Sequence, residues 1–379
     1  MENNKRKIKS LQTLRALAFL GIFAEHSYGA DYGAWGVSVF FILSGFLMIY
    51  SYKGRYPEAN IKAAGALAVK KIKKLYPLHL VMIAVVICMM VFDKSFKFTK
   101  VLLLHYAKLL AANILLIQTW LPRVDLSISM NGPAWYLSVS LFLYFMFPFI
   151  ADLINKPRKK QFPVLMILAI YIIQLTAAFI MKNFGNLFSY SDNWNQWFTY
   201  CFPIFRLGDF IMGCLLGYII CNGEKISMHA NKTIYTIAEA AVVLITIFVL
   251  PKMFIDDRYF WGSEWFKYSL LYSPFSLLLI YLFFRKEGYI TKFLTNKATI
   301  WIGDMSPYAF LIHVPVINII TTLIRPLEIA LYNKAPDINM YYILTVRALI
   351  CLTVTLLLSC IAQKLFNQHI KAESLADNN

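Results

Sequence analysis

Long apolar runs alternate with short polar or basic stretches along the whole chain. A helix needs about 20 mainly apolar residues to cross a bilayer. Ten runs approach this length, and the pattern predicts an all-α fold, a polytopic membrane helix bundle. The expected spans are residues 11–28, 35–52, 75–92, 134–154, 163–181, 203–222, 234–250, 267–284, 299–325 and 341–366.

These spans follow one another without a tract long enough for a second domain. We therefore expect one integral-membrane domain over residues 1–379, with no soluble appendage. It would end in the span 341–366 and a short cytoplasmic tail.

One further apolar run, residues 101–119, contains His105 and Lys108. If it crossed the membrane, every later loop would change sides, and two basic loops would face outward against the positive-inside rule. We therefore predict an interfacial or re-entrant helix on the outer side.

The composition agrees with a membrane protein, since 59% of the residues are hydrophobic and 15% charged. Soluble domains have roughly 45–50% apolar and about 25% charged residues. The net charge of +17 could suggest a nucleic-acid partner, but its distribution argues against one. With a cytoplasmic N-terminus, the predicted inner segments carry 22 Lys and Arg residues and the outer ones 10. This asymmetry follows the positive-inside rule and predicts a multi-pass protein of the cell membrane.

The six cysteines lie in or beside apolar runs, and none has Cys-x-x-Cys spacing. Buried free cysteine behaves as a small apolar side chain. We therefore expect neither a structural disulfide nor a metal site.

The first predicted span carries ionisable residues at both ends, namely Arg15, Glu25 and His26. Its basic start could also indicate a cleaved signal peptide, but Arg15 interrupts the apolar run and favours an uncleaved span. Eleven positions separate Arg15 from His26, which at about 100° per residue places them on one face, about 16 Å apart. Glu25 points about 100° away from His26.

Ionisable residues inside a span usually face a bundle interior or a wet cavity. The shared face therefore suggests a polar path through the bundle. Alternatively, Arg15 snorkels to the inner headgroups and His26 is an ordinary residue of the outer interface.

An ordered set of motifs resembles the acyltransferase 3 family of membrane-bound acyltransferases. The first two spans contain "TLRALAFLGIFAEH" and "GVSVFFILSGF", and the following loop ends in "KKIKKLYPLHL". Later segments that match the family in its order are "NGPAWYLSVSLFLYFMFP", "FRLGDFIMGCLLG" and "WIGDMSPYAFLIHVPV". The resemblance covers roughly residues 10–320 of the chain.

The chain also departs from the family pattern. Lys71 and Lys74 stand where Arg-x-x-Arg is usual, which keeps the charge but loses the bidentate fork. Ser140 replaces a Glu found in many relatives with a fused esterase-like domain, and we expect no such domain here. Pro307 and Phe310 stand where Tyr is common, and Tyr308 is the hydroxyl that could replace one.

The resemblance implies acyl transfer, most often of acetyl, from cytoplasmic acyl-CoA to a hydroxyl of a surface or exported polysaccharide or a lipid-linked sugar. Histidine has the basicity to deprotonate an attacking alcohol. His26 would act as this base or accept the acyl group first as an acyl-imidazole. Arg15, Trp135 and Arg206 are candidate donors to the oxyanion.

Two groups of cations are candidates for contacts with the CoA donor. Lys71 and Lys74 share a helical face and would bind its phosphates, or would anchor the loop to anionic lipid. Arg206 would line the donor path, or would form a structural pair with Asp209 at i, i+3.

Five further residues are expected to line the site. Trp135 would stack on a sugar or adenine, unless it belongs to the outer aromatic belt. The small pair Ser44 and Gly45 would permit close helix packing or approach to the thioester. His313 and Tyr308 complete the set, with a buried, hydrogen-bonded histidine as the alternative for His313.

Two other functions remain open from the sequence. Ten spans with buried Arg and His would also suit a polysaccharide exporter, although no internal repeat of the kind common in transporters is evident. Succinyl transfer would want a cation beside the thioester, such as Arg206 or Arg347. The acceptor and the oligomeric state are left open.

Overall fold

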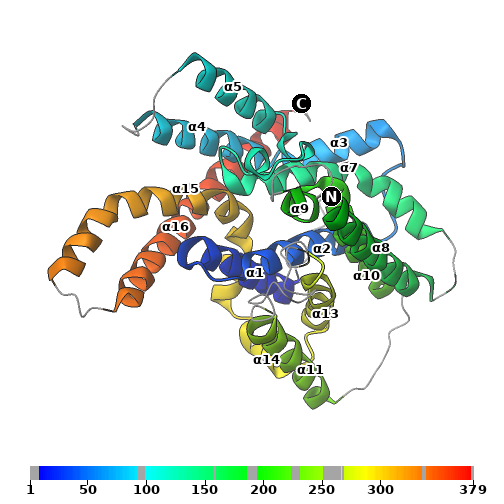
Figure 1. Cartoon of the computed structure of the whole chain (residues 1–379). Coiled ribbons are helices and arrows are strands. Elements are labelled where there is room, and N and C mark those ends of the chain that lie inside the picture. Colours follow the sequence, from blue (N-terminus) through cyan, green and yellow to red (C-terminus); the bar gives the residue numbers. More distant parts are fainter. Residues whose placement is uncertain are drawn as a thin grey trace.

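The computed structural model describes residues 8–92, 99–156, 159, 161–185, 194–222, 231–250, 266, 269–334 and 339–376. Over these residues the chain forms helices and no strand (Figure 1). The predicted all-α class is therefore confirmed.

Every one of the ten apolar runs coincides with a helix, within the described residues. The helices in order are α1 Lys9–Tyr28, α2 Gly33–Tyr52, α3 Ile61–Ile72, α4 Tyr76–Phe92, α5 Lys100–Ile114, α6 Val124–Ser127, α7 Trp135–Asn155, α8 Phe162–Gly185, α9 Trp194–Gln196, α10 Pro203–Asn222, α11 Lys232–Leu244, α13 Tyr272–Arg285, α14 Tyr289–Leu294, α15 Lys297–Lys334 and α16 Met340–Ala376. Short 3-10 or π turns lie at Gln118–Trp120, Gly132–Ala134, Trp197–Cys201 and Ile245–Val249.

Seven of the described helical segments are long and apolar enough to cross a membrane, or eight if the bent α3–α4 pair counts as one span. The two other predicted spans are α1 and α13. Helix α1 carries Arg15 and Glu25, which reduce its apolarity, and α13 has only 14 residues. Helix α5 has 15 residues, which is short for a crossing. Its interfacial or re-entrant placement stays a prediction.

Helix α2 occupies the middle of the bundle. It packs against α1, α10 and α13, while α1 also packs against α15. In Figure 1 the pair α15–α16, the pair α4–α5 and the pair α8–α10 radiate from this centre. Of the apolar stretch of α2, 78% is buried inside the protein, against 11% for α8. Helix α8 therefore has the exposure expected of a lipid-facing helix.

Glycine allows the backbones of α2 and α10 to touch. A Cβ atom on Gly45 would lie 2.0 Å from the carbonyl oxygen of Phe210. In the opposite direction, a Cβ on Gly213 would lie 1.9 Å from the carbonyl oxygen of Ile42. Both distances are far below van der Waals contact, so each position excludes any side chain. Gly45 thus has the packing role that small residues have between membrane helices.

Helix α1 is fixed at the centre by similar contacts. A Cβ on Gly36 of α2 would lie 2.4 Å from the carbonyl oxygen of Ala18, and one on Gly303 of α15 would lie 1.9 Å from that of Gln12. Close backbone contacts therefore hold α1 against both α2 and α15.

We expect Gly45→Ala to destabilise the protein by about 1–3 kcal/mol, because an added atom in a full interface forces backbone shifts. Gly65→Ala is the matched control, since Gly65 lies in α3 and no atom lies within 4 Å of its Cβ position. The control should stabilise by about 0.5–1 kcal/mol through helix propensity. Thermal unfolding in detergent measures both variants, and equal melting of Gly45→Ala and wild type would contradict the α2–α10 contact.

Candidate functional site

A cavity of about 570 Å³ lies beside the last turn of α1. This volume is within the range of ligand pockets, about 300–1,000 Å³. Its walls come from α1, α2, α15, the segment that precedes α7, and the residues before α10. The polar side chains in its lining are Glu25, His26, Asp31, Gln196, Tyr200 and Asn318.

His26 is exposed and faces this cavity. Helix α1 ends just after it because Gly29 adopts a left-handed conformation, with φ 75°. The N–H of Gly29 donates to the carbonyl oxygen of Glu25, and that of Ala30 donates to the carbonyl oxygen of Ala24. Glu25 also lines the cavity and accepts a hydrogen bond from the backbone N–H of Gly33. The carboxylate thus ties the end of α1 to the start of α2.

His313 of α15 lies beside His26, with 5.1 Å between the ring centroids. It is fully buried, and its Nδ1 lies 2.8 Å from the carbonyl oxygen of Phe310 and 3.2 Å from that of Ala309. A carbonyl only accepts, so Nδ1 carries the proton in the neutral ring and Nε2 keeps a lone pair. This Nε2 is buried and has no hydrogen-bond partner among the described residues.

Two prolines of α15 leave carbonyl groups without a helical donor, because proline has no N–H. Pro315 releases the carbonyl of Leu311, and the side-chain amide of Asn131 donates to it at 2.9 Å. Pro307 releases the carbonyl of Gly303, and the hydroxyl of Ser306 lies 2.9 Å away as its donor. The first bond joins α15 to the segment before α7.

That segment carries Trp135 into the cavity wall. The indole is 4% exposed, and its ring centroid lies 4.6 Å from that of Tyr200 and 5.9 Å from that of Phe41. Trp135 therefore belongs to the wall of the site and not to a lipid-facing belt.

Arg206 lies behind this wall and does not line the cavity. It is fully buried, its Nη1 pairs with Asp209 at 2.7 Å, and its Nε donates to the carbonyl oxygen of Tyr200 at 2.8 Å. Ser269 and Ser273 also donate to the Asp209 carboxylate. The arrangement matches the structural pair considered from the i, i+3 spacing, and it holds Tyr200 in place. Its predicted contact with the donor stays a prediction.

Arg15 is also absent from the cavity lining. The side chain of Arg15 is half-buried, and it interacts electrostatically with the hydroxyl of Tyr136. The same hydroxyl forms hydrogen bonds with Ser44 and Ser140. The Tyr136 ring packs 5.3 Å from that of Phe310, a cavity-lining residue. Arg15 and Ser44 thus form a second polar group, and the structure does not join them to His26.

Of the two predicted phosphate ligands, Lys74 lies near α15 and Lys71 near the end of α2. The ammonium group of Lys74 is 5.5 Å from the ring centroid of Tyr308, and that of Lys71 is 5.8 Å from the ring of Tyr52. Tyr308 precedes His313 by five residues, which is about 7.5 Å along a helix. Tyr308 is fully buried. Because Tyr308 and His313 both belong to α15, this helix connects Lys74 with the histidine pair.

Sequence reasoning missed several residues of the site. Asp31, Asn318 and Gln196 line the cavity, but none of them stands out by spacing or charge pattern. Tyr200 was also missed, because its position depends on the buried Arg206. Among the described residues, no group of three or more His, Cys, Asp or Glu side chains could hold a metal ion.

Comparison with known proteins yields a family match over nearly the whole chain. The family, described as an acyltransferase domain, matches residues 8–364. The chain is 27% identical over 239 residues to the acyltransferase MdmB of Streptomyces mycarofaciens, which covers 57% of this chain and 58% of that protein. No solved structure matches the chain.

Two other relatives are named as O-acetyltransferases. A putative O-acetyltransferase of Staphylococcus aureus is 24% identical, over 88% of this chain and 55% of that protein. The peptidoglycan O-acetyltransferase OatA of Listeria monocytogenes is 22% identical, over 85% of this chain and 51% of that protein. The chain therefore spans about half the length of the curated relatives that it matches.

We expect Arg206→Met to destabilise the protein by about 3–5 kcal/mol, since it leaves the Asp209 carboxylate buried without its cation. The double variant Arg206→Met, Asp209→Leu should recover most of this loss. Lys156→Met is the control, because the Lys156–Asp152 pair is 57% exposed on both sides and exposed pairs contribute only about 0–1 kcal/mol. Thermal unfolding in detergent measures all three. If Arg206→Met were as stable as wild type, the Arg206–Asp209 pair would not be isolated from water.

Proposed function

Because this chain belongs to the acyltransferase 3 family, we propose that it transfers an acetyl group from acetyl-CoA to a hydroxyl of a surface or exported polysaccharide or of a lipid-linked sugar. The family and the O-acetyltransferase relatives support acyl transfer to a hydroxyl. The observation that carries the finer proposal is the exposed His26 imidazole in a cavity of about 570 Å³, with His313 next to it.

In the proposed reaction His26 acts as the general base. It takes the proton of the acceptor hydroxyl as the oxygen attacks the thioester carbonyl. The tetrahedral intermediate then expels the CoA thiolate, which receives the proton from the imidazolium. Transfer through an acyl-imidazole on His26 uses the same residues, and it would label the protein when acetyl-CoA is added without an acceptor.

We assign His313 a positioning role. Its Nδ1–H is engaged by backbone carbonyls, so only its Nε2 lone pair is available on the side away from its own helix. We propose that this Nε2 accepts a hydrogen bond from the protonated ring nitrogen of His26. The second ring nitrogen of His26 would then keep its lone pair and could act as the base.

Trp135 lines the cavity, whereas the other two candidate oxyanion donors, Arg15 and Arg206, do not. We therefore propose that Trp135 contacts the substrates and that Arg206 keeps Tyr200 in the wall beside it. The distances between Arg206, Tyr200 and Trp135 support this division.

The donor is proposed to enter from the side of Lys71 and Lys74. Ammonium groups bind phosphate well as point charges, and Lys74 is exposed. Lys74 contacts Tyr308, and Tyr308 precedes His313 by about 7.5 Å along α15. The thioester would then reach the cavity along α15, with a cytoplasmic N-terminus as the sequence predicts.

The acceptor is proposed to be a glycan of the cell envelope. The name of the Listeria relative makes peptidoglycan one candidate. We propose the cell membrane as its location, which the apolar helices and the charge distribution of the loops support.

We expect His26→Ala to lower acetyl transfer by about 10²–10⁴-fold, the usual contribution of a positioned base. Membranes that contain the protein would be supplied with radiolabelled acetyl-CoA, and label in the glycan fraction would be measured. His105→Ala is the control, because His105 is exposed on α5 and lies outside the cavity.

Both variants should insert at the wild-type level, and only His26→Ala should lose the label. Undiminished transfer by His26→Ala would refute its role. Transfer by neither variant nor wild type, with the glycan exported, would favour an exporter.

A further inference from the structure

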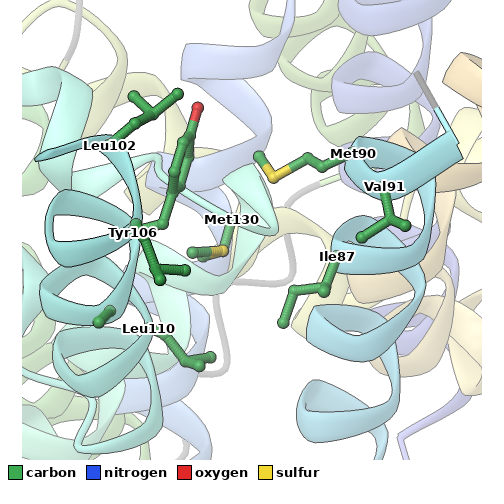
Figure 2. A pocket seen from close by; sticks show the side chains of 9 residues that line it. Ile87, Met90, Val91, Leu102, Tyr106, Leu110 and Met130 are labelled. Atoms are coloured by element: carbon green, nitrogen blue, oxygen red, sulfur yellow. The ribbon is translucent and has the colours of Figure 1, made fainter. Parts of the chain in front are cut away.

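A second cavity, almost wholly apolar, lies between α4 and α5 (Figure 2). Its volume is about 220 Å³. Side chains from the two helices face each other across it, with Met130 between them. We call it the α4–α5 groove. Its lining residues are Ile87, Met90, Val91, Leu102, Leu103, Tyr106, Ala107, Leu110 and Met130.

Met130 also lines the cavity that contains His26. The two spaces therefore share one wall. The backbone of Met130 has φ 57°, which is unusual for a residue other than glycine. Such a conformation persists only where the surrounding structure fixes it.

The residues around Met130 supply that constraint. The amide of Asn113 donates to the hydroxyl of Ser129 at 2.9 Å, and that hydroxyl donates to the carbonyl oxygen of Leu126 at 2.7 Å. On the other side, Asn131 is bonded to Leu311 of α15. The shared wall thus has a defined position between the groove and the histidine pair.

We propose that the α4–α5 groove binds the hydrocarbon chain of a lipid-linked sugar acceptor and so presents its head to His26. This inference rests on the proposed function and specifies its acceptor as membrane-anchored through a single chain. A chain in the groove would end beside Met130, next to the cavity that would receive the sugar.

The size of the groove favours a single chain. An apolar cavity of about 150 Å³ holds one benzene molecule, so about 220 Å³ accommodates a short length of one chain.

Helix α5, which forms one side of the groove, carries two exposed cations, Lys100 and Lys108. Cations beside an apolar groove complement a lipid whose chain joins its sugar through phosphate.

The first test is binding, which does not depend on acyl transfer. The full-length protein in nanodiscs would be photolabelled with a diazirine-bearing decaprenyl phosphate, and the labelled peptides mapped by mass spectrometry. Labelling should fall on Ile87–Val91 and Leu102–Leu110. Unlabelled decaprenyl phosphate should compete, whereas phosphatidylglycerol at the same mole fraction should not. Equal competition by phosphatidylglycerol would overturn the proposal, because the groove would then be an ordinary contact with bilayer lipid.

The matched variants are Ala107→Phe and Ala111→Phe on α5. Ala107 lines the groove, whereas Ala111 is exposed outside its lining. Filling the groove should reduce labelling about tenfold, which corresponds to about 1.4 kcal/mol, and Ala111→Phe should leave it unchanged. Unchanged labelling of Ala107→Phe would also overturn the proposal.

The second test separates this inference from the proposed function. Acetyl transfer would be measured with one glycan supplied either free or linked to decaprenyl diphosphate. Ala107→Phe should raise the KM for the lipid-linked form about tenfold and leave that for the free form unchanged. An active enzyme whose two KM values do not diverge would contradict the groove alone. Inactivity of wild type on both forms, with the photolabelling intact, would contradict the proposed function alone.

Discussion

The contact between the backbones of α2 and α10 is the constraint on which the bundle depends. Gly45 and Gly213 leave no space for a Cβ atom on either helix. Without a hydrophobic force between helices inside lipid, such close approach, with its many van der Waals contacts, is what holds membrane helices together. It makes α2 the central helix, and α1 then packs against α2 through Gly36 and against α15 through Gly303. His26 and His313 meet because α1 and α15 are held at this distance.

The wall of the cavity also depends on buried polar groups, which need hydrogen-bond partners because water does not reach them. An unpaired polar group in an apolar environment costs several kcal/mol, and two such groups, the Asp209 carboxylate and the Leu311 carbonyl, receive hydrogen bonds from residues distant in the sequence. The carboxylate of Asp209 pairs with Arg206 and accepts hydrogen bonds from Ser269, just before α13, and Ser273, within it. The carbonyl of Leu311, released by Pro315, is taken by Asn131. These bonds place both Tyr200 and the segment with Trp135 at the cavity.

Local patterns in the sequence predicted the elements better than their contacts. Each span predicted from the length of an apolar run contains a helix among the described residues. Helix α15 continues to Lys334, beyond the apolar run that ends at Arg325. Helical spacing anticipated the Arg206–Asp209 pair, because it joins neighbours on one turn. It also placed Arg15 and His26 on one face, but that could not show which neighbours each would meet. Arg15 acts on Tyr136 of α7 while His26 lies beside His313 of α15. The bond between Asn131 and Leu311 spans 180 residues, and no local pattern indicates it.

The hydrogen bond from Asn131 to the carbonyl of Leu311 has a consequence for remodelling this scaffold. The segment 124–134 supplies several residues of the cavity wall and would be the natural piece to exchange between homologues when a new acceptor is wanted. Its graft would have to keep an amide at position 131 as long as the host helix keeps Pro315. Otherwise a bare carbonyl would be left two residues from the histidine, and the transplanted wall would lose its anchor.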